Sequence, residues 1–214
     1  METRKISQAV IRRLPRYYRY LGELLEDGVE RISSNDLSKR MKLTASQIRQ
    51  DLNNFGGFGQ QGYGYSVSAL KEEIARILGL DGRKKMILLG AGNLGKAIVG
   101  SLDFEGSGFD LMAIFDTNEW VVGSEIREYP VISTDKLEDF CHEHHPEAAI
   151  LCIPQEGAEL LVPQLVELGV RSFLNFSHYD IDIEFSNVAV ENVYIADSLM
   201  TLSYRAAALE EEQE

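Results

Sequence analysis

The chain has few cysteines and no long apolar segment. Its 214 residues include only Cys141 and Cys152, which are too few for a disulfide framework. No apolar run approaches the roughly 20 residues of a membrane-spanning helix, and the first residues, Met1–Ile6, form no apolar signal core. With 44% hydrophobic and 26% charged residues, the composition is that of a globular protein, which we expect in the cytoplasm.

Side chains that could bind a metal are also scarce. The densest group, residues 141–145, contains one cysteine and three histidines but has no zinc-site spacing. It fits the end of a helix before Pro146 better, and we therefore expect no metal site.

Charge is distributed unevenly along the chain. Residues 1–70 carry a net charge of +4 and residues 71–214 carry −17, which together make the −13 of the whole chain. A basic head on an acidic body predicts a polyanionic partner for the head alone. On charge alone, a chance asymmetry is almost as good an explanation.

Three helical patterns follow one another in the basic head. The first begins near Pro15, the second covers residues 36–41, and the third is expected over residues 45–55 with Thr44 as its N-cap. Gln47 would complete a capping box with Thr44. A short helix, a tight turn and a second short helix predict a helix-turn-helix.

The third predicted helix has two faces. Ile48, Leu52 and Phe55 share an apolar face that should be buried. The polar face suits DNA, because arginine can pair with guanine and glutamine or asparagine with adenine. We expect DNA contacts from Thr44, Ser46, Gln47, Arg49, Gln50 and Asn53. Plain packing is the alternative, and Asp51 would repel phosphate unless a neighbour such as Arg40 neutralised it.

A glycine and aromatic segment, residues 58–65, follows the helix-turn-helix and has no helical period. It predicts a hairpin that forms the wing of a winged helix and places Tyr63 against the DNA backbone or minor groove. Another helix is expected from Ser68 to Gly79. Residues 1–80 are therefore predicted to form a winged-helix DNA-binding domain.

Residues 86–95 indicate a buried strand, a G-x-G-x-x-G loop and the start of a helix. In this motif the first glycine makes a tight turn, the second admits a pyrophosphate, and the third lets the helix pack on the strand. The helix N-terminus adds N–H groups and a positive dipole end. The predicted cofactor-binding residues of this loop are Gly90, Ala91, Gly92, Asn93, Leu94 and Gly95.

Asp116 ends the next predicted strand, 21 residues after Gly95. An acid at about this spacing binds the adenosine ribose and repels a 2′-phosphate, so the sequence favours NAD over NADP. Further strands near residues 148–153, 171–176 and 188–190 alternate with helices. This α/β pattern predicts a Rossmann-type doubly wound parallel sheet over residues 81–195.

The carboxyl edge of that sheet should hold the ligand, which places Pro154 and Asn175 near the nicotinamide end. Only His178 and Tyr179 could supply acid–base chemistry there, which makes an enzyme the weaker reading. An NAD-dependent oxidoreductase with an N-terminal docking domain is the alternative. A third possibility is a module for another nucleotide, such as coenzyme A, against which Asp116 counts.

An amphipathic helix is expected in residues 196–214, ahead of an acidic end. Leu199 and Leu202 need an apolar partner, either on their own sheet or on a second subunit.

Taken together, these residues resemble the Rex family of redox-sensing transcriptional repressors. The resemblance runs from about residue 4 to about residue 207. It is carried by Arg13-Leu14-Pro15-Arg16-Tyr17-Tyr18-Arg19, Ile32-Ser33-Ser34, Gln47-Ile48-Arg49-Gln50-Asp51-Leu52, Phe55-Gly56-Gly57-Phe58-Gly59, Gly62-Tyr63-Gly64-Tyr65, Gly90–Gly95 and Asn175-Phe176.

The resemblance implies a homodimer with exchanged tail helices that binds palindromic operator DNA and is released by NADH. NAD(H) would be a regulatory ligand of the Gly90–Gly95 loop and Asp116, and Arg16 would sense the redox state through the partner's tail. Tyr194 stands where some members have an aspartate that pairs with the equivalent of Arg16, and Asp197 is a possible substitute. Ser177-His178 replaces the more usual Ala-Pro, and Gln50, Gln60 and Gln61 replace basic residues.

Overall fold

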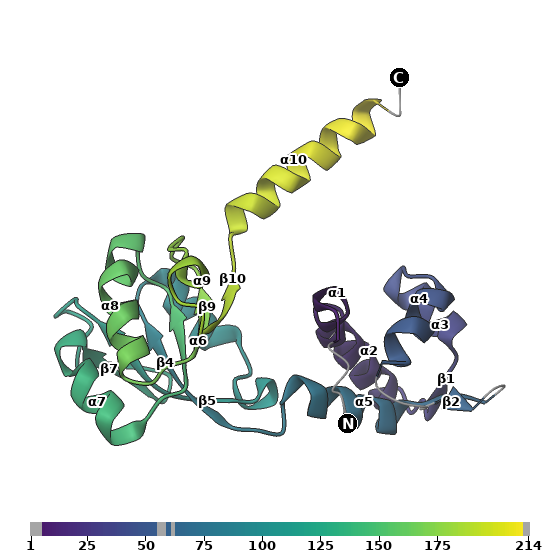
Figure 1. Cartoon of the computed structure of the whole chain (residues 1–214), viewed down its shortest axis with the longest axis horizontal. Coiled ribbons are helices and arrows are strands. Elements are labelled where there is room, and N and C mark those ends of the chain that lie inside the picture. Colours follow the sequence, from purple (N-terminus) through teal and green to yellow (C-terminus); the bar gives the residue numbers. More distant parts are fainter. Residues whose placement is uncertain (1–5, 55–58, 61–62, 212–214) are drawn as a thin grey trace. The chain divides into compact units, whose positions relative to one another are not determined.

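The computed structural model describes residues 6–54, 59–60 and 63–211, and the chain divides into two compact units, Met1–Gly82 and Arg83–Glu214 (Figure 1). The first unit packs its helices around one apolar core that includes Tyr17, Met41 and Ile48. Its elements are α1 (Gln8–Ile11), α2 (Leu14–Glu26), β1 (Arg31–Ile32), α3 (Ser34–Met41), α4 (Ala45–Leu52), β2 (Gly59–Gln60), β3 (Gly64–Ser66) and α5 (Val67–Leu78).

The helix-turn-helix is confirmed as α3, a tight turn and α4. Ser33 caps α3 by accepting from the N–H of Asp36, and Lys42 ends it in a left-handed conformation. Thr44 caps α4 by accepting from the N–H of Gln47 at 3.1 Å. These two caps fix where each helix begins, so the turn between them is short.

Two details of α4 differ from the prediction. The Gln47 side chain does not complete a capping box; it donates to the buried Asp51 carboxylate at 2.9 Å, a stronger, charge-assisted bond. The helix ends at Leu52 and not at Phe55, since the Asn54 side chain donates to the carbonyls of Gln50 and Asp51. Phe55 itself lies outside the described residues.

The wing hairpin is also confirmed, within the residues that are described. β2 and β1 both pair antiparallel with β3, in the order β1-β3-β2. A helix-turn-helix followed by such a sheet is a winged helix. Gln61 lies outside the described residues, as does Gly62.

The second unit is a seven-stranded sheet, in the order β10-β9-β8-β4-β5-β7-β6, in which every pairing is parallel except β6 with β7. Its elements are β4 (Lys84–Leu89), α6 (Asn93–Ser101), η1 (Glu105–Ser107), β5 (Phe109–Asp116), β6 (Glu125–Ile126), β7 (Tyr129–Ser133), η2 (Thr134–Lys136), α7 (Leu137–His144), β8 (Ala148–Leu151), α8 (Gln155–Glu167), β9 (Ser172–Asn175), α9 (Ile181–Glu184), β10 (Ala189–Asn192) and α10 (Ile195–Glu211). The predicted Rossmann-type sheet is therefore confirmed.

The two faces of this sheet are covered unequally. α7, α8 and α9 pack on one face, where Phe115, Leu151 and Phe173 are buried. α6 packs on the other face against Leu88 and Ile150. On the α6 face, residues of β8, β9 and β10 line an open apolar groove, among them Ile150, Leu174 and Val190.

Candidate DNA-binding face and dinucleotide site

The polar face of α4 is exposed, as a DNA-reading helix requires. Ser46, Arg49, Gln50 and Asn53 are exposed, together with the cap residue Thr44, and Gln47 is half-buried. Tyr63, at the wing, is also exposed, with 72% of its surface accessible. The predicted residues are thus available to base edges or phosphates.

The Asp51 carboxylate joins α4 to α2. Asp51 is fully buried, and it accepts hydrogen bonds from Arg13 Nε at 2.7 Å, Arg13 Nη2 at 2.8 Å, Tyr17 Oη at 3.0 Å and Gln47 Nε2 at 2.9 Å. Burial alone would raise the pKa of Asp51, but the hydrogen bonds from Arg13, Gln47 and Tyr17 outweigh it and hold that pKa below its usual range.

Asp51 therefore does not present an uncompensated charge to DNA. Its partner is Arg13, and the prediction of Arg40 is wrong: Arg40 instead lies 3.8 Å from the carboxylate of Asp27. We interpret Asp51 as the residue that positions α4, and Gln47 with it, on the rest of the winged helix.

Two basic side chains of the winged helix, Arg49 on α4 and Arg31 at the wing, contact neighbouring residues. Arg49 donates to Ser34 Oγ at 3.1 Å, which connects the two helices of the helix-turn-helix. The Arg31 guanidinium lies 5.9 Å from the centre of the Tyr63 ring and donates to the Tyr63 carbonyl at 3.4 Å. Sequence reasoning missed Arg31, because only the hairpin geometry brings it beside the wing.

Arg16 lies in α2 with its guanidinium 5.5 Å from the centre of the Tyr20 ring. Hydrogen bonding from Arg16 lowers the pKa of Tyr20. The role of Arg16 as a switch stays a prediction. So does the idea that Asp197, an exposed residue of α10, pairs with Arg16 in place of the aspartate that some members of the family have at the position of Tyr194.

The glycine loop has the geometry that a pyrophosphate site needs. Gly90 has φ +102°, and a Cβ there would collide with the Cys152 carbonyl; a Cβ on Gly95 would collide with the Gly90 carbonyl. A Cβ on Gly92 would meet nothing within 4 Å. Gly92 caps α6 without a side-chain hydrogen bond, so the cap residue leaves the first N–H groups of this helix available to an anion.

Asp116 lies directly against this loop. One carboxylate oxygen accepts from the N–H of Ala91 at 2.6 Å, and the other accepts from the N–H of Asn118 at 2.8 Å. Asp116 is half-buried, so both oxygens keep lone pairs that could accept ribose hydroxyls. The loop and the acid thus form one unit that fits a dinucleotide, with its adenosine toward β5.

The carboxyl ends of four strands are in register beside the loop. Backbone N–H groups just past each strand donate to the neighbouring strand, as in Cys152 to Leu89 at 2.8 Å, Phe176 to Leu151 at 3.1 Å, and Val193 to Asn175 at 2.9 Å. A dinucleotide on the glycine loop with adenosine toward β5 would extend its nicotinamide toward β8 and β9.

Pro154 and Asn175 both lie at this edge but differ in availability. Pro154 is exposed and is the N-cap of α8. The Asn175 side chain is buried; it donates to the Tyr179 carbonyl and to Asn192 Oδ1, both at 2.8 Å, and accepts from the N–H and hydroxyl of Ser177. Because its hydrogen bonds are used within the protein, we expect Asn175 to position the loop after β9.

Trp120 follows Asp116 in an exposed loop. It is 95% exposed, and its backbone N–H donates to Asn118 Oδ1 at 3.0 Å. Since the Asn118 N–H in turn donates to Asp116, two side-chain hydrogen bonds connect this loop to the predicted ribose site.

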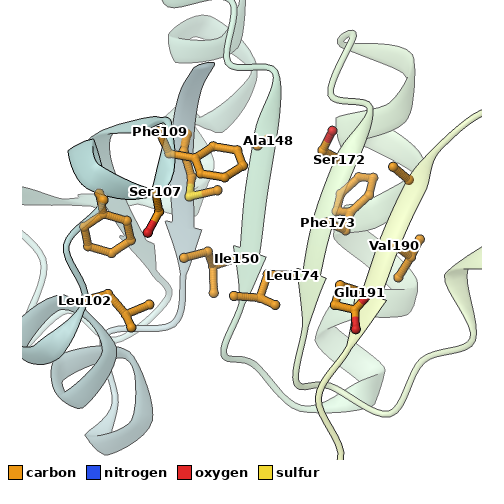
Figure 2. A pocket seen from close by; sticks show the side chains of 13 residues that line it. Leu102, Ser107, Phe109, Ala148, Ile150, Ser172, Phe173, Leu174, Val190 and Glu191 are labelled. Carbon is orange, nitrogen blue, oxygen red and sulfur yellow. The ribbon is translucent and has the colours of Figure 1, made fainter. Parts of the chain in front are cut away.

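An apolar groove of about 450 Å³ lies on the α6 side of the sheet. Figure 2 shows side chains of β8, β9 and β10, among them Ile150, Leu174 and Val190, along this groove. The tail helix α10 has an exposed apolar stripe. Ile195, Leu199, Leu202 and Leu209 repeat along it at helical spacing and are 59–62% exposed.

Residues 6–54, 59–60 and 63–211 contain no group of three or more His, Cys, Asp or Glu side chains that could hold a metal ion. The described helices include none long and apolar enough to cross a membrane.

The exposed polar face of α4 and the glycine loop joined to Asp116 define a class of protein: DNA-binding regulators that carry a nucleotide-binding domain. Comparison with known families agrees. The family "Putative DNA-binding protein N-terminus" matches residues 5–53, and the family "CoA binding domain" matches residues 81–179.

The chain belongs to the Rex family of redox-sensing transcriptional repressors. It is 51% identical over 201 residues to the redox-sensing transcriptional repressor Rex of Clostridioides difficile, covering 94% of this chain and 95% of that protein. It is 52% identical over 200 residues to the Rex of Caldanaerobacter subterraneus, covering 94% and 89%. The predicted family membership is thus confirmed.

Solved structures give the same result. The crystal structure of RSP, a Rex-family repressor, in complex with β-NAD⁺ and operator DNA matches with a TM-score of 0.89 and 50% identity, covering 97% of this chain and 95% of that one. RSP in complex with β-NADH matches with a TM-score of 0.87 and 46% identity, covering 98% of both chains.

Proposed function

We propose that this protein is a repressor that binds palindromic operator DNA through α4 and the wing and is released when NADH binds the Gly90–Gly95 loop. The observation that carries the proposal is the combination, in one chain, of an exposed polar α4 face with an open glycine loop joined to Asp116. The relatives are named repressors, and RSP has been crystallised with operator DNA, NAD⁺ and NADH. Since operators lie on the chromosome, the proposal places the protein in the cytoplasm.

The proposal requires a difference in affinity, because a ligand shifts an equilibrium only by binding one state better. NADH must bind the DNA-free form more tightly than the operator-bound form, and operator DNA must weaken NADH binding by the same factor. A gel shift on a palindromic operator, titrated with NADH and then NAD⁺, tests release. Calorimetry of NADH binding with and without operator tests reciprocity, and equal affinities would refute the proposal.

An oxidoreductase is the second candidate, favoured only by His178 at the nicotinamide edge. His178 is exposed, in a left-handed turn with φ +63°. Turnover of NADH with simple aldehydes and ketones, measured by loss of NADH absorbance, separates the two functions. The repressor proposal expects NADH to bind without being consumed.

Arg49→Ala should weaken specific operator binding by about 1–3 kcal/mol and relax discrimination at one base pair. The reason is that Arg49 is exposed on α4 and carries the bidentate donors that suit guanine. Fluorescence anisotropy on a set of operator variants measures both effects. Arg76→Ala removes an arginine of the same unit that is paired with Glu73 on α5, and should leave affinity unchanged. Equal losses on operator and random DNA would rule out base reading by Arg49.

The proposed assembly is a homodimer in which the tail helices are exchanged. α10 exposes an apolar stripe, and the sheet has an apolar groove on its α6 side (Figure 2). An apolar helix needs a partner surface. We propose that the groove of one copy receives α10 of the other, which would also present two winged helices to a palindrome.

Leu202→Glu should therefore produce a monomer and lower affinity for a palindromic operator by at least about tenfold, since one half-site contact would be lost. Sedimentation velocity measures the assembly and anisotropy measures the binding. Thr201→Glu adds the same charge one residue away, outside the stripe, and should preserve the dimer. A dimer that survives Leu202→Glu would contradict the proposed tail contact.

A further inference from the structure

Two aromatic rings stack at the carboxyl edge of the sheet, just beyond the predicted nicotinamide end. The imidazole of His178 and the phenol ring of Tyr194 have centroids 4.8 Å apart and an interplanar angle of 11°. His178 follows β9, and Tyr194 follows β10. Neither ring belongs to the apolar clusters of the core, so core packing does not explain the stack.

The loop that carries His178 is held firmly. Asn175 bridges it from within, because its amide donates to the Tyr179 carbonyl while its oxygen accepts from Ser177 at 2.9 Å and 2.6 Å. The same amide donates to Asn192 at the end of β10. The backbone around His178 is thus fixed to both strands, whereas the exposed imidazole extends from it.

Tyr194 lies between this edge and the tail. It directly precedes Ile195, the first residue of α10. Its hydroxyl is buried and has no hydrogen-bond partner among the described residues. Burial, together with the charges of Asp180, Asp182 and Asp197, raises the pKa of Tyr194. Because the hydroxyl has no partner in the described part of the chain, contact with the His178 ring, and not a hydrogen bond, positions the Tyr194 ring.

We infer that the His178–Tyr194 stack is the connection through which the nicotinamide end of the site acts on the tail helix. A nicotinamide ring that extends over β8 and β9 reaches the loop of His178 first. A shift of the His178 imidazole would move the Tyr194 ring that stacks on it. Because Tyr194 directly precedes Ile195, the first residue of α10, such a movement would be passed to the tail helix. The inference rests on the proposed function and adds the path by which NADH binding reaches α10. In this path His178 and Tyr194 are positioning residues.

The test measures coupling, defined as the ratio of NADH dissociation constants with and without operator. His178→Asn keeps a residue that tolerates the left-handed backbone but removes the ring, and Tyr194→Leu keeps apolar volume without a ring. Each should reduce the coupling by about threefold to tenfold. Tyr194→Leu, which alters no residue beside the nicotinamide, should also keep the NADH affinity of the DNA-free dimer within about twofold. The double variant should lose no more than the larger single loss, since both act through one contact.

Tyr194→Phe is the matched control, because it keeps the stacked ring, and it should retain the wild-type coupling. His142→Asn, an exposed histidine of α7, should do the same. Wild-type coupling in His178→Asn and Tyr194→Leu would overturn the inference, and so would additive losses in the double variant or a full loss in Tyr194→Phe. A wild-type protein without any coupling would instead refute the proposed function.

Discussion

Replacing Asp51 by alanine should lower the free energy of unfolding of the N-terminal unit by about 2–4 kcal/mol. The substitution leaves the Arg13 guanidinium, the Tyr17 hydroxyl and the Gln47 amide without their common acceptor. Loss of one partner of a fully buried ion pair costs about 3–5 kcal/mol. The lower range applies because 27% of the Arg13 side chain is exposed and can be rehydrated. Urea denaturation of the full chain, followed by circular dichroism, measures the change.

Asp27→Ala is the control for the loss of a carboxylate. Asp27 pairs with Arg40 at 3.8 Å, and its side chain is 63% exposed, so its removal should change stability little. If the two substitutions lowered the free energy of unfolding equally, Asp51 would not be the residue that holds α4 on the rest of the unit. Operator affinity should also fall in Asp51→Ala, because Gln47 and α4 would lose their anchor.

Low pH should weaken the hydrogen bonds between the Asp51 carboxylate and Arg13, Tyr17 and Gln47. The pKa of Asp51 is depressed in the folded state, so its contribution is complete above the unfolded value of about 3.9. It is lost as pH falls through the lower folded value. Asp51→Asn should therefore flatten the decline in stability of the N-terminal unit below about pH 4.

Gly95→Ala should reduce NADH affinity by at least about tenfold. The new Cβ would collide with the carbonyl oxygen of Gly90, so α6 must move away from β4 and the glycine loop must change shape. Such overpacking costs about 1–3 kcal/mol, and 1.4 kcal/mol corresponds to tenfold in affinity. Calorimetric titration with NADH measures the loss, and operator binding in the absence of NADH should persist.

Gly100→Ala offers a control within the same helix. A Cβ at Gly100 would meet nothing within 4 Å, so the substitution should leave NADH affinity unchanged. It should also raise stability by about 0.5–1 kcal/mol, because alanine favours the helix. Unchanged NADH affinity in Gly95→Ala would mean that the pyrophosphate binds elsewhere.

Local patterns in the sequence predicted most of both units. Caps such as Thr44, the glycine spacing of residues 90–95 and the position of Asp116 depend on short stretches of chain, and the fold has them where they were expected. The short β6–β7 hairpin was not predicted, because β6 has only two residues and shows no alternation.

Contacts between distant residues could not be predicted in the same way. Arg13 and Asp51 are 38 residues apart, and the sequence suggested a nearer arginine instead. The His178–Tyr194 stack depends on the pairing of β9 with β10, which no local pattern specifies. Asn175 was expected to lie near the cofactor because it ends a strand. The sequence could not show that its side chain donates hydrogen bonds to the Tyr179 carbonyl and to Asn192.

The exposed Trp120 gives the protein a built-in optical signal. It is the only tryptophan in the sequence, so indole emission comes from one place. Two hydrogen bonds connect its loop to Asp116, beside the proposed dinucleotide site. Reduced nicotinamide absorbs where indole emits, whereas the oxidised ring does not. Quenching of Trp120 with sensitised NADH emission would therefore distinguish the two redox forms without a label.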